Sequence, residues 1–479
     1  MEKPLSQVVK QGLAGNEDVT VRGITSDSRD VSAGDLFVAC AGTVHDGHDF
    51  AADAVERGAV AICSERRIDV AVPNVVVVDL KRRQGELAAA FYDDPSARLG
   101  CIGVTGTNGK TSIAYFTAAL IETGAFIGTI GWGSADKLCP SRLTTEDPIT
   151  IQARLHALAE RGHRWVVMEA SSHALDQGRV DAVHFGIAIF SNLTRDHLDY
   201  HGTMQRYAAA KRSLFERKSL KAAVINVDDV LGREIAASLD AGIDCIGVGA
   251  DGDISWSDVR YLEDGVSGTL TTPWGTAEFR MPVYGDFSIA NVAAAVAASC
   301  LAGTSLGDAM NKITRLPHVP GRMQRVSGTH GPLLLVDYAH TPDALAAVLK
   351  AIRQHLAGTL ICVFGCGGDR DRGKRALMAQ AVEAGADRAI VTSDNPRSED
   401  PEAIIRDVLK GFSSAYAGTE AVETEIDRAS AIARAIASAG DNDIVLVAGK
   451  GHENYQEIAG HRYPYSDLVT ARQLLGGTE

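Results

Sequence analysis

The residues with the clearest chemical potential lie within 102–112, where the chain reads IGVTGTNGKTS. Two glycines, Gly106 and Gly109, free the backbone so that amide N–H groups can converge on an anion. Lys110 adds a positive charge for phosphates, and Thr111 offers a hydroxyl to Mg²⁺. This combination predicts a phosphate-binding loop.

The match to the strict phosphate-loop pattern is partial, because Val104 stands where that pattern has its first glycine. The flanking segments support the prediction: CIGV is typical of a strand, and SIAYFTAALIE of a helix that begins at the same point. An ordinary strand-turn-helix corner with a chance lysine is the alternative, but the order of elements favours the loop. We expect these residues to contact nucleotide: Gly106, Thr107, Asn108, Gly109, Lys110, Thr111 and Ser112.

Two further polar clusters follow strand-like runs. WVVMEASSH places Glu169 at the end of one run, and IFSNLTRDHLDYHGT places His197 after the next. Because ligands of open α/β sheets bind at the carboxyl ends of strands, both clusters are expected at the cleft of Lys110, with Glu169 on Mg²⁺ and His197 on a second metal or its water. Taken singly, Glu169 would be interpreted as a salt-bridge or capping residue, and the cluster of His197 as a capped, solvated start of a helix. The segment TMQRYAAAKRSLFERK, taken by itself, predicts that Lys211 is exposed.

Composition excludes several classes of protein. A chain of 479 residues, 45% of them hydrophobic, is expected to form more than one domain. The formal net charge of −14 argues against a nucleic-acid or anionic-membrane surface, so we expect neither partner. We find no leader pattern and no uncharged apolar run of about 18 residues, and expect a cytoplasmic protein. The 8 cysteines have no metal-site spacing and are predicted to be reduced thiols.

The hydrophobic pattern predicts an α/β protein of three domains. Residues 1–95 hold short strand-like runs between helices, as in a small α/β domain. Residues 96–318 alternate strand-like and helical runs, which indicates a P-loop-type, mostly parallel sheet flanked by helices. Residues 319–479 carry strand-like runs that end in glycine- or proline-rich turns before helices, which predicts a Rossmann-like α/β domain.

Taken together, nine motifs resemble one family, the Mur (muramyl-peptide) ligases. In chain order they are GTNGKTS, MEASSHALDQGRV, NLTRDHLDYHGTM, YAAAKRSLF, PGRMQRV, DYAHTPDAL, FGCGGDRDRGKR, SDNPR and AGKGHENYQ. The resemblance runs from about residue 23 to about residue 467. It implies ATP-dependent amide formation through an acyl phosphate, with Mg²⁺, in cytoplasmic peptidoglycan precursor synthesis. The implied substrates are UDP-N-acetylmuramoyl-L-alanyl-D-glutamate and meso-diaminopimelate, and we expect a monomer.

The resemblance also implies a role for each matching residue. The implied catalytic residues are Lys110, His197, Lys211 and Arg322. The implied metal-site residues are Thr111, Glu169, His197 and Lys211, the last as a carbamate. Further implied ATP contacts are Asn291, Asp337 and His340. The implied contacts to the UDP-muramoyl dipeptide are Ser26, Ser28, Thr43, Val44, His45, Thr144, Thr145, Ser171, Gln177 and Arg179. The implied amino-acid site is Arg370, Asp394, Asn395, Pro396, Arg397, Gly449 and Glu453.

The amino-acid site carries the specificity prediction. Asp394 to Arg397 would be a simple turn on most surfaces. In the family context, Arg397 and Arg370 suit the distal carboxylate of diaminopimelate, while Glu453 and the Gly449 carbonyl suit its ammonium. Lysine lacks that carboxylate, so diaminopimelate is expected over lysine. The alternatives are ligation of L-lysine, a folylpolyglutamate synthase-like ligase, and a P-loop switch without ligase activity.

Two positions depart from the pattern that the resemblance implies. Leu143 stands where the family often has asparagine before the Thr-Thr pair, which affects one expected hydrogen bond to the muramoyl ligand. Ser288 replaces an asparagine in the stretch that precedes Asn291, which affects the adenine contacts. Neither position touches the residues expected to carry the transfer chemistry.

Overall fold

The computed structural model describes residues 1–10, 13, 17–42, 45–326, 331–417 and 419–476. The chain separates into two compact units. The first comprises Met1–Asp253 with Ala294–Ser305, and the second comprises Ile254–Ala293 with Leu306–Glu479. Within the described residues, no helix is long and apolar enough to cross a membrane.

The first unit begins with a small parallel sheet in the order β3-β4-β5-β6. Its core is formed by apolar residues of the strands and of helix α3, such as Leu36, Val38 and Leu87. The strands are β3 (Gly23–Thr25), β4 (Asp35–Ala39), β5 (Ala61–Ser64) and β6 (Asn74–Val76). A short pair, β1 (Lys3–Pro4) and β2 (Thr20–Val21), and the helices α1 (Leu5–Val9), α2 (Ala51–Glu56), α3 (Leu80–Phe91) and α4 (Pro95–Arg98) complete this region.

The main sheet of the first unit has the order β10-β9-β8-β11-β7-β12-β13-β14. From β8 to β14 neighbouring strands are parallel, and the central residues of β8, β11, β7, β12 and β13 are buried, as in a sheet covered on both faces. Its strands are β7 (Gly100–Thr105), β8 (Gly124–Gly128), β9 (Gly131–Ser134), β10 (Lys137–Cys139), β11 (Trp165–Glu169), β12 (Phe185–Phe190), β13 (Ala222–Asn226) and β14 (Asp244–Val248). Its helices are α5 (Lys110–Leu120), α6 (Pro148–Glu160), α7 (Ser172–Asp176), α8 (Leu198–His201), α9 (Met204–Arg212) and α10 (Val230–Ser238).

The second unit contains two sheets. An antiparallel sheet joins β15 (Ser255–Leu262), β16 (Gly265–Thr272) and β17 (Gly275–Met281), followed by α11 (Asp286–Leu301) and α12 (Leu306–Ile313). The other sheet has the order β18-β19-β23-β20-β21-β22 and is parallel except for β18. Its strands are β18 (Gln324–Val326), β19 (Leu333–Asp337), β20 (Leu360–Phe364), β21 (Arg388–Thr392), β22 (Val422–Glu425) and β23 (Ile444–Ala448).

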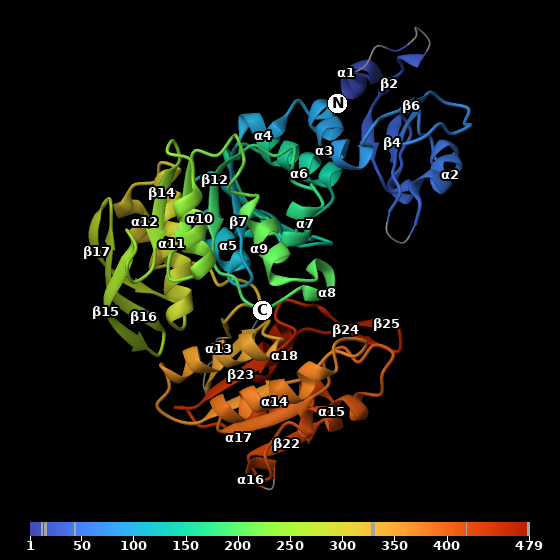
Figure 1. The fold of residues 1–479 in the computed structure, drawn as a ribbon. Helices are drawn as coiled ribbons and strands as arrows, with labels where there is room; N and C mark the ends of the chain where they lie inside the picture. Colours follow the sequence, from blue (N-terminus) through green and yellow to red (C-terminus); the bar gives the residue numbers. More distant parts are fainter. Residues whose placement is uncertain (11–12, 14–16, 43–44, 327–330, 418, 477–479) are drawn as a thin grey trace. The chain divides into compact units, whose positions relative to one another are not determined.

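Helices cover both faces of this parallel sheet (Figure 1, orange and red). One face packs on α13 (Pro342–Arg353), α14 (Gly373–Gly385) and α15 (Pro401–Leu409), and the other on α17 (Arg428–Ser438) and α18 (Asp467–Leu474). The short helix α16 (Ser414–Ala417) and the hairpin of β24 (Tyr455–Ile458) and β25 (His461–Pro464) lie outside the sheet. Thr341 and Asp400 cap α13 and α15 just before a proline at the first helical position, which explains where these helices begin.

The fold class expected from the sequence is confirmed. The strand predicted before the phosphate loop is β7, and the helix predicted after it is α5. The C-terminal sheet alternates parallel strands and helices, as expected for a Rossmann-like domain.

Candidate functional site

The predicted phosphate loop connects β7 to α5. Gly106 and Gly109 have φ angles of +148° and +85°, which L side chains rarely adopt. A Cβ atom at Gly106 would also lie 1.8 Å from Ser191 Oγ, so a side chain does not fit there. Lys110 Nζ donates to the carbonyls of Gly106 (2.9 Å) and Thr107 (2.8 Å), which curls the lysine over its own loop.

The end of β12 holds this loop in place. Thr107 N donates to the carbonyl of Asn192 (2.8 Å), and Asn108 N donates to the Asn192 side chain (2.9 Å). Ser191 Oγ donates to the Asn108 carbonyl (2.5 Å). Ser191 and Asn192 therefore support the loop from the end of a neighbouring strand, and no motif of the sequence indicated Ser191 in this role.

Glu169 and Thr111 form the best candidate for a magnesium site. The Glu169 side chain, at the end of β11, is buried, with 1% of the residue exposed. Its carboxylate accepts hydrogen bonds from Thr111 Oγ1 (3.0 Å) and from the backbone N–H of Thr129 (2.8 Å). A carboxylate and a hydroxyl at the phosphate loop are hard oxygen donors, which suits Mg²⁺.

Protein ligands alone do not complete that site. In the part of the chain that the structure describes, no group of three or more His, Cys, Asp or Glu side chains is arranged to hold a metal ion. Mg²⁺ usually keeps waters and substrate phosphates alongside one or two carboxylates, so the pair formed by Glu169 and Thr111 is compatible with it. A magnesium ion there would neutralise phosphate charge.

Lys211 is buried, in contrast to what its helix predicts. Although its helix, α9, is polar in sequence, the residue is only 1% exposed, and its Nζ lies 4.2 Å from the centre of the Tyr207 ring. Burial, reinforced by the nearby charge of Lys110, holds the pKa of the Lys211 amine well below its usual value. The exposed lysine that the helix pattern alone favours is therefore wrong.

His197 lies near Lys211 in a group of rings. It has a left-handed backbone, with φ of +51°, at the start of α8. Burial lowers the pKa of its imidazole; Asp196 opposes this shift, while Lys110 and Lys211 add to it. The ring centre of His173 lies 4.9 Å from that of His197, and His201 and Tyr207 pack beside them. The histidines were visible in the motifs, but their convergence was not.

The residues expected to hold the muramoyl dipeptide share one hydrogen-bond network. Thr145 Oγ1 donates to the Glu169 carbonyl (2.7 Å) and accepts from Ser171 N (3.1 Å). Arg179 donates to the Thr145 carbonyl (2.9 Å) and to Gln177 Oε1 (2.9 Å from Nε). The hydroxyls of Thr129 and Thr144 are hydrogen-bonded, and the backbone N–H of Thr129 donates to the Glu169 carboxylate. The five predicted residues therefore gather beside the candidate magnesium site: Thr144, Thr145, Ser171, Gln177 and Arg179.

A large cavity in the first unit contains the residues expected to bind uridine diphosphate. It has a volume of about 1180 Å³, which is ample for a nucleotide. Ser26, Ser28 and His45 line it, together with Trp132 and Arg142 from the main sheet and its connections. Thr43 and Val44, expected at the same site, lie outside the described residues.

In the second unit, Arg322, Asp337 and His340 lie at or next to Tyr338. The Arg322 guanidinium lies 4.5 Å from the Tyr338 ring centre, and the His340 ring centre lies 4.7 Å from it. Asp337 is buried at the end of β19, where burial raises the pKa of its carboxyl and the N–H groups of Met323 and Ala339 donate to it. Asn291 is buried in α11.

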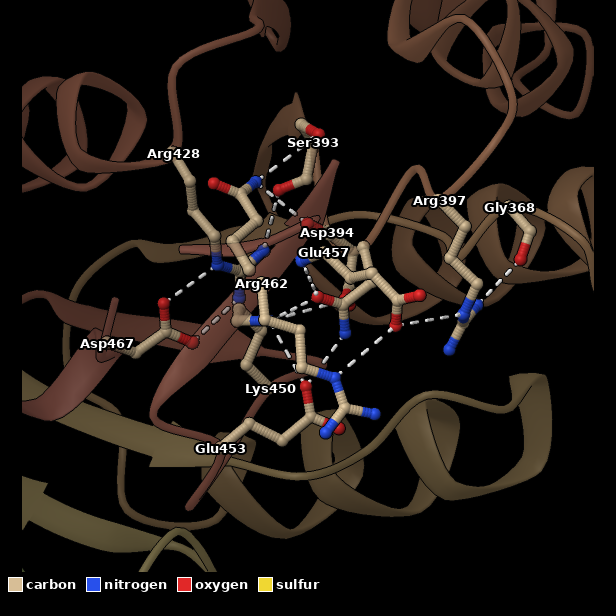
Figure 2. A network of polar contacts seen from close by, with 12 residues as sticks. Gly368, Ser393, Asp394, Arg397, Arg428, Lys450, Glu453, Glu457, Arg462 and Asp467 are labelled. Carbon is tan, nitrogen blue, oxygen red and sulfur yellow. Dashed lines mark hydrogen bonds and ion pairs between the residues drawn. The ribbon is translucent and has the colours of Figure 1, made fainter. Parts of the chain in front are cut away.

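The residues of the expected amino-acid site follow the carboxyl ends of β20, β21 and β23. Figure 2 shows three of them, Asp394, Arg397 and Glu453. Arg397 has φ of +52°, and its Nη1 donates to the Gly368 carbonyl (2.6 Å). A Cβ at Gly367 would lie 2.9 Å from Arg397 Nη1 and 3.9 Å from Arg370 Cγ, so both arginines flank this glycine. Arg397 Nε also faces the Glu457 carboxylate at 3.8 Å.

The rest of that site is one connected cluster. Asn395 Nδ2 donates to Glu453 Oε2 (2.8 Å), and a Cβ at Gly449 would meet Asp394 Oδ2 at 2.6 Å. The Pro396 carbonyl approaches Gly368 closely enough to exclude a Cβ there. Lys450, which sequence reasoning passed over, lies fully buried among these residues. All seven predicted residues thus belong to one end of the C-terminal sheet: Arg370, Asp394, Asn395, Pro396, Arg397, Gly449 and Glu453.

Family models match most of the chain in three consecutive segments. Residues 20–92 match the model of the Mur ligase family, catalytic domain. Residues 104–299 match the Mur ligase middle domain, and residues 321–451 match the Mur ligase, glutamate ligase domain. The chain belongs to the Mur ligase family.

Relatives of known description span the whole chain. The UDP-N-acetylmuramoyl-L-alanyl-D-glutamate--2,6-diaminopimelate ligase of Coxiella burnetii is 43% identical over 490 residues, which cover 99% of each chain. The enzyme of the same description from Xanthomonas campestris pv. campestris is 46% identical, covering 98% of this chain and 97% of that one. A solved structure described as this ligase is 39% identical, with a TM-score of 0.72 and 99% of each chain covered.

Folylpolyglutamate synthase of Mycobacterium tuberculosis, complexed with ADP and AMPPCP, also resembles this chain in fold. The TM-score is 0.63 at 17% identity, covering 83% of this chain and 96% of that one. An identity this low indicates a shared fold and no more.

Proposed function

We propose that this protein joins meso-diaminopimelate to UDP-N-acetylmuramoyl-L-alanyl-D-glutamate at the expense of ATP, in peptidoglycan precursor synthesis. The carrying observation is the full-length similarity, at 43% and 46% identity, to ligases described by this reaction. The phosphate loop with its buried Thr111–Glu169 pair supports the ATP-dependent step.

The proposed reaction has two steps. The γ-carboxylate of the D-glutamyl residue attacks the γ-phosphorus of ATP, giving an acyl phosphate and ADP. The amine of diaminopimelate then attacks the acyl carbon, loses a proton, and the tetrahedral intermediate expels phosphate to leave the amide. Lys110 and Arg322 would spread the charge of the transferred phosphoryl group, which is where such transfers gain most of their acceleration.

Binding of the other ligands follows the site description. Glu169 and Thr111 would hold Mg²⁺, with His197 and Lys211 near a second ion; Asn291, Asp337 and His340 would bind ATP. The cavity lined by Ser26, Ser28 and His45 would hold the uridine nucleotide. The three domains 1–95, 96–318 and 319–479 remain part of this proposal, supported by family models that each fall within one of these ranges.

A cytoplasmic location and a monomeric state belong to the same proposal. The 8 cysteines are all free thiols, as expected in a reducing compartment. Analytical ultracentrifugation of the purified protein would test the monomer, which a concentration-dependent dimer would contradict.

The test of the proposed function is phosphate release by the purified protein with ATP, Mg²⁺ and the UDP-muramoyl dipeptide. Diaminopimelate and L-lysine are supplied in parallel, and the product is identified by mass. We expect release only with diaminopimelate. Release with lysine alone would keep the ligase class and reject the specificity. Phosphate release with neither amino acid, but with a folate and glutamate, would favour the folylpolyglutamate reaction. Nucleotide binding without any phosphate release would favour a switch.

Specificity should depend on Arg397. In Arg397→Ala we expect the KM for diaminopimelate to rise about thirtyfold, because a hydrogen-bonded ion pair with the distal carboxylate contributes about 2 kcal/mol. Arg406→Ala is the matched control, since Arg406 is an exposed arginine of α15 in the same domain. Steady-state kinetics with varied diaminopimelate would measure the change; a KM within twofold of the wild-type value would reject this role.

A further inference from the structure

Lys450 is a fully buried lysine that none of the steps above uses. It follows β23 and Gly449, whose φ of +118° turns the chain toward the Asp394–Arg397 loop. The whole residue is 0% exposed. Burying an ammonium is costly unless several groups compensate its charge, so its surroundings are informative.

The Lys450 ammonium is directed at the expected amino-acid site (Figure 2). Nζ lies 3.0 Å from Asn395 Oδ1 and 3.1 Å from Glu453 Oε2. Asp394 Oδ1 lies 3.9 Å away. The three partners are all residues expected to contact diaminopimelate, and two of them are 55 residues or more distant in the chain.

These contacts determine which way Asn395 points. Its Oδ1 accepts from both Lys450 Nζ and the Glu457 N–H (2.9 Å), so its Nδ2 must face Glu453, where it donates to Oε2 at 2.8 Å. Lys450, Asn395 and Glu453 thus form a closed triangle. Both partners bind the same carboxylate oxygen; among the described residues, Glu453 Oε1 makes no hydrogen bond and is left for a ligand.

The charge of the cluster also suits a cation. Lys450 and the two carboxylates that pair with it, Asp394 and Glu453, have a formal net charge of −1. The adjacent pairs Arg428–Asp467 and Arg397–Glu457 add none, and the exposed Arg462 lies beyond Glu457. Without Lys450 the carboxylates of Asp394 and Glu453 would lose the ammonium that both face, and Asn395 would lose one of the two donors that orient it. An ammonium group is the ligand chemistry that a singly negative, oxygen-rich cluster recognises.

We propose that Lys450 is a positioning residue: together with Asn395, which it orients, it holds the Glu453 carboxylate so that Glu453 Oε1 can bind the ammonium end of the incoming amino acid. This inference rests on the proposed function, because it concerns the amino acid which that reaction consumes. Lys450 acts through its neighbours and need not touch the substrate.

The test compares Lys450→Met with Lys410→Met, an exposed lysine of the same domain. We expect the KM for diaminopimelate to rise at least about tenfold in Lys450→Met, with the KM values for ATP and the UDP-muramoyl dipeptide within about twofold of wild type. Lys410→Met should match wild type in all three. A uniform loss across the three substrates, or an unchanged KM for diaminopimelate, would overturn the proposal.

A double-mutant cycle separates positioning from general stability. If Lys450 acts through Glu453, Lys450→Met combined with Glu453→Gln should raise the KM for diaminopimelate no more than the worse single variant. If the two substitutions multiply their effects on the KM for diaminopimelate, the proposal is contradicted. It is also contradicted if the melting temperature of Lys450→Met has fallen and cooling restores its KM for diaminopimelate. If the wild-type protein ligates lysine instead, the same cycle is run with lysine. A wrong prediction of the amino acid is then distinguished from a wrong role for Lys450. A wild-type protein that ligates neither amino acid overturns both.

Discussion

Lys211→Ala should lower kcat by about 10²- to 10³-fold, the loss typical of removing one preorganised charge stabiliser. Burial depresses the pKa of the Lys211 amine, which favours its neutral form, and a neutral amine can add to CO₂, forming an N–C bond and releasing a proton. The resulting carbamate would be an anion near Lys110, whose charge disfavours the protonated lysine but would favour the carbamate. Phosphate release under saturating substrates measures the effect.

The rescue pattern identifies the carbamate. Acetate or formate should restore part of the activity of Lys211→Ala by replacing the lost carboxylate, whereas bicarbonate alone should not, because no amine remains to react. Lys218→Ala, an exposed lysine a few residues further on, is the matched control and should keep full activity. Full activity in Lys211→Ala would dispose of the idea.

Glu169→Gln should lower activity about as much as Lys211→Ala, but it should also change the dependence of activity on Mg²⁺. The glutamine keeps the shape and one acceptor for Thr111 and Thr129 but loses the charge that would hold Mg²⁺. We expect kcat/KM for ATP to fall about 10²- to 10³-fold, and the Mg²⁺ concentration for half-maximal activity to rise. A magnesium titration of phosphate release measures both quantities.

Stability must be separated from that effect. The amide also presents N–H donors to a pocket of donors, which costs about 1–3 kcal/mol of folding free energy. A thermal melt of the same preparation shows whether the protein is folded at the assay temperature. Glu160→Gln, at an exposed position in α6, is the control. An unchanged magnesium dependence in folded Glu169→Gln would exclude Glu169 as a ligand.

The features predictable from the sequence are those whose determinants are local. The turn at Gly106 and Gly109 needs backbone angles that only glycine adopts readily, and the strand before it and helix after it follow from neighbouring residues. The same holds for the alternation of strands and helices, which predicts a parallel α/β sheet and brings strand ends such as Glu169 to one edge.

The burial of a polar residue was not predictable in this way. Lys211 lies in a polar helix, MQRYAAAKR, and its environment depends on the Tyr207 ring beside it and on the rings of His197 and His201 that pack against Tyr207. His173 lies in α7, apart from the segment that carries His197 and His201, and only the folded chain brings its ring to theirs.

The chain by itself therefore determined the class of fold, the phosphate loop and the order of the motifs, because glycine geometry and hydrophobic periodicity act over a few residues. Tertiary structure decided which charges are desolvated and what each one faces. The contact of Lys450 with Asn395 joins residues 55 positions apart, and its location cannot be read from the turn-like sequence AGKGHE. Desolvation depends on every segment that packs around a group, so the depressed pKa of Lys211 and the burial of Lys450 exist only in the folded protein.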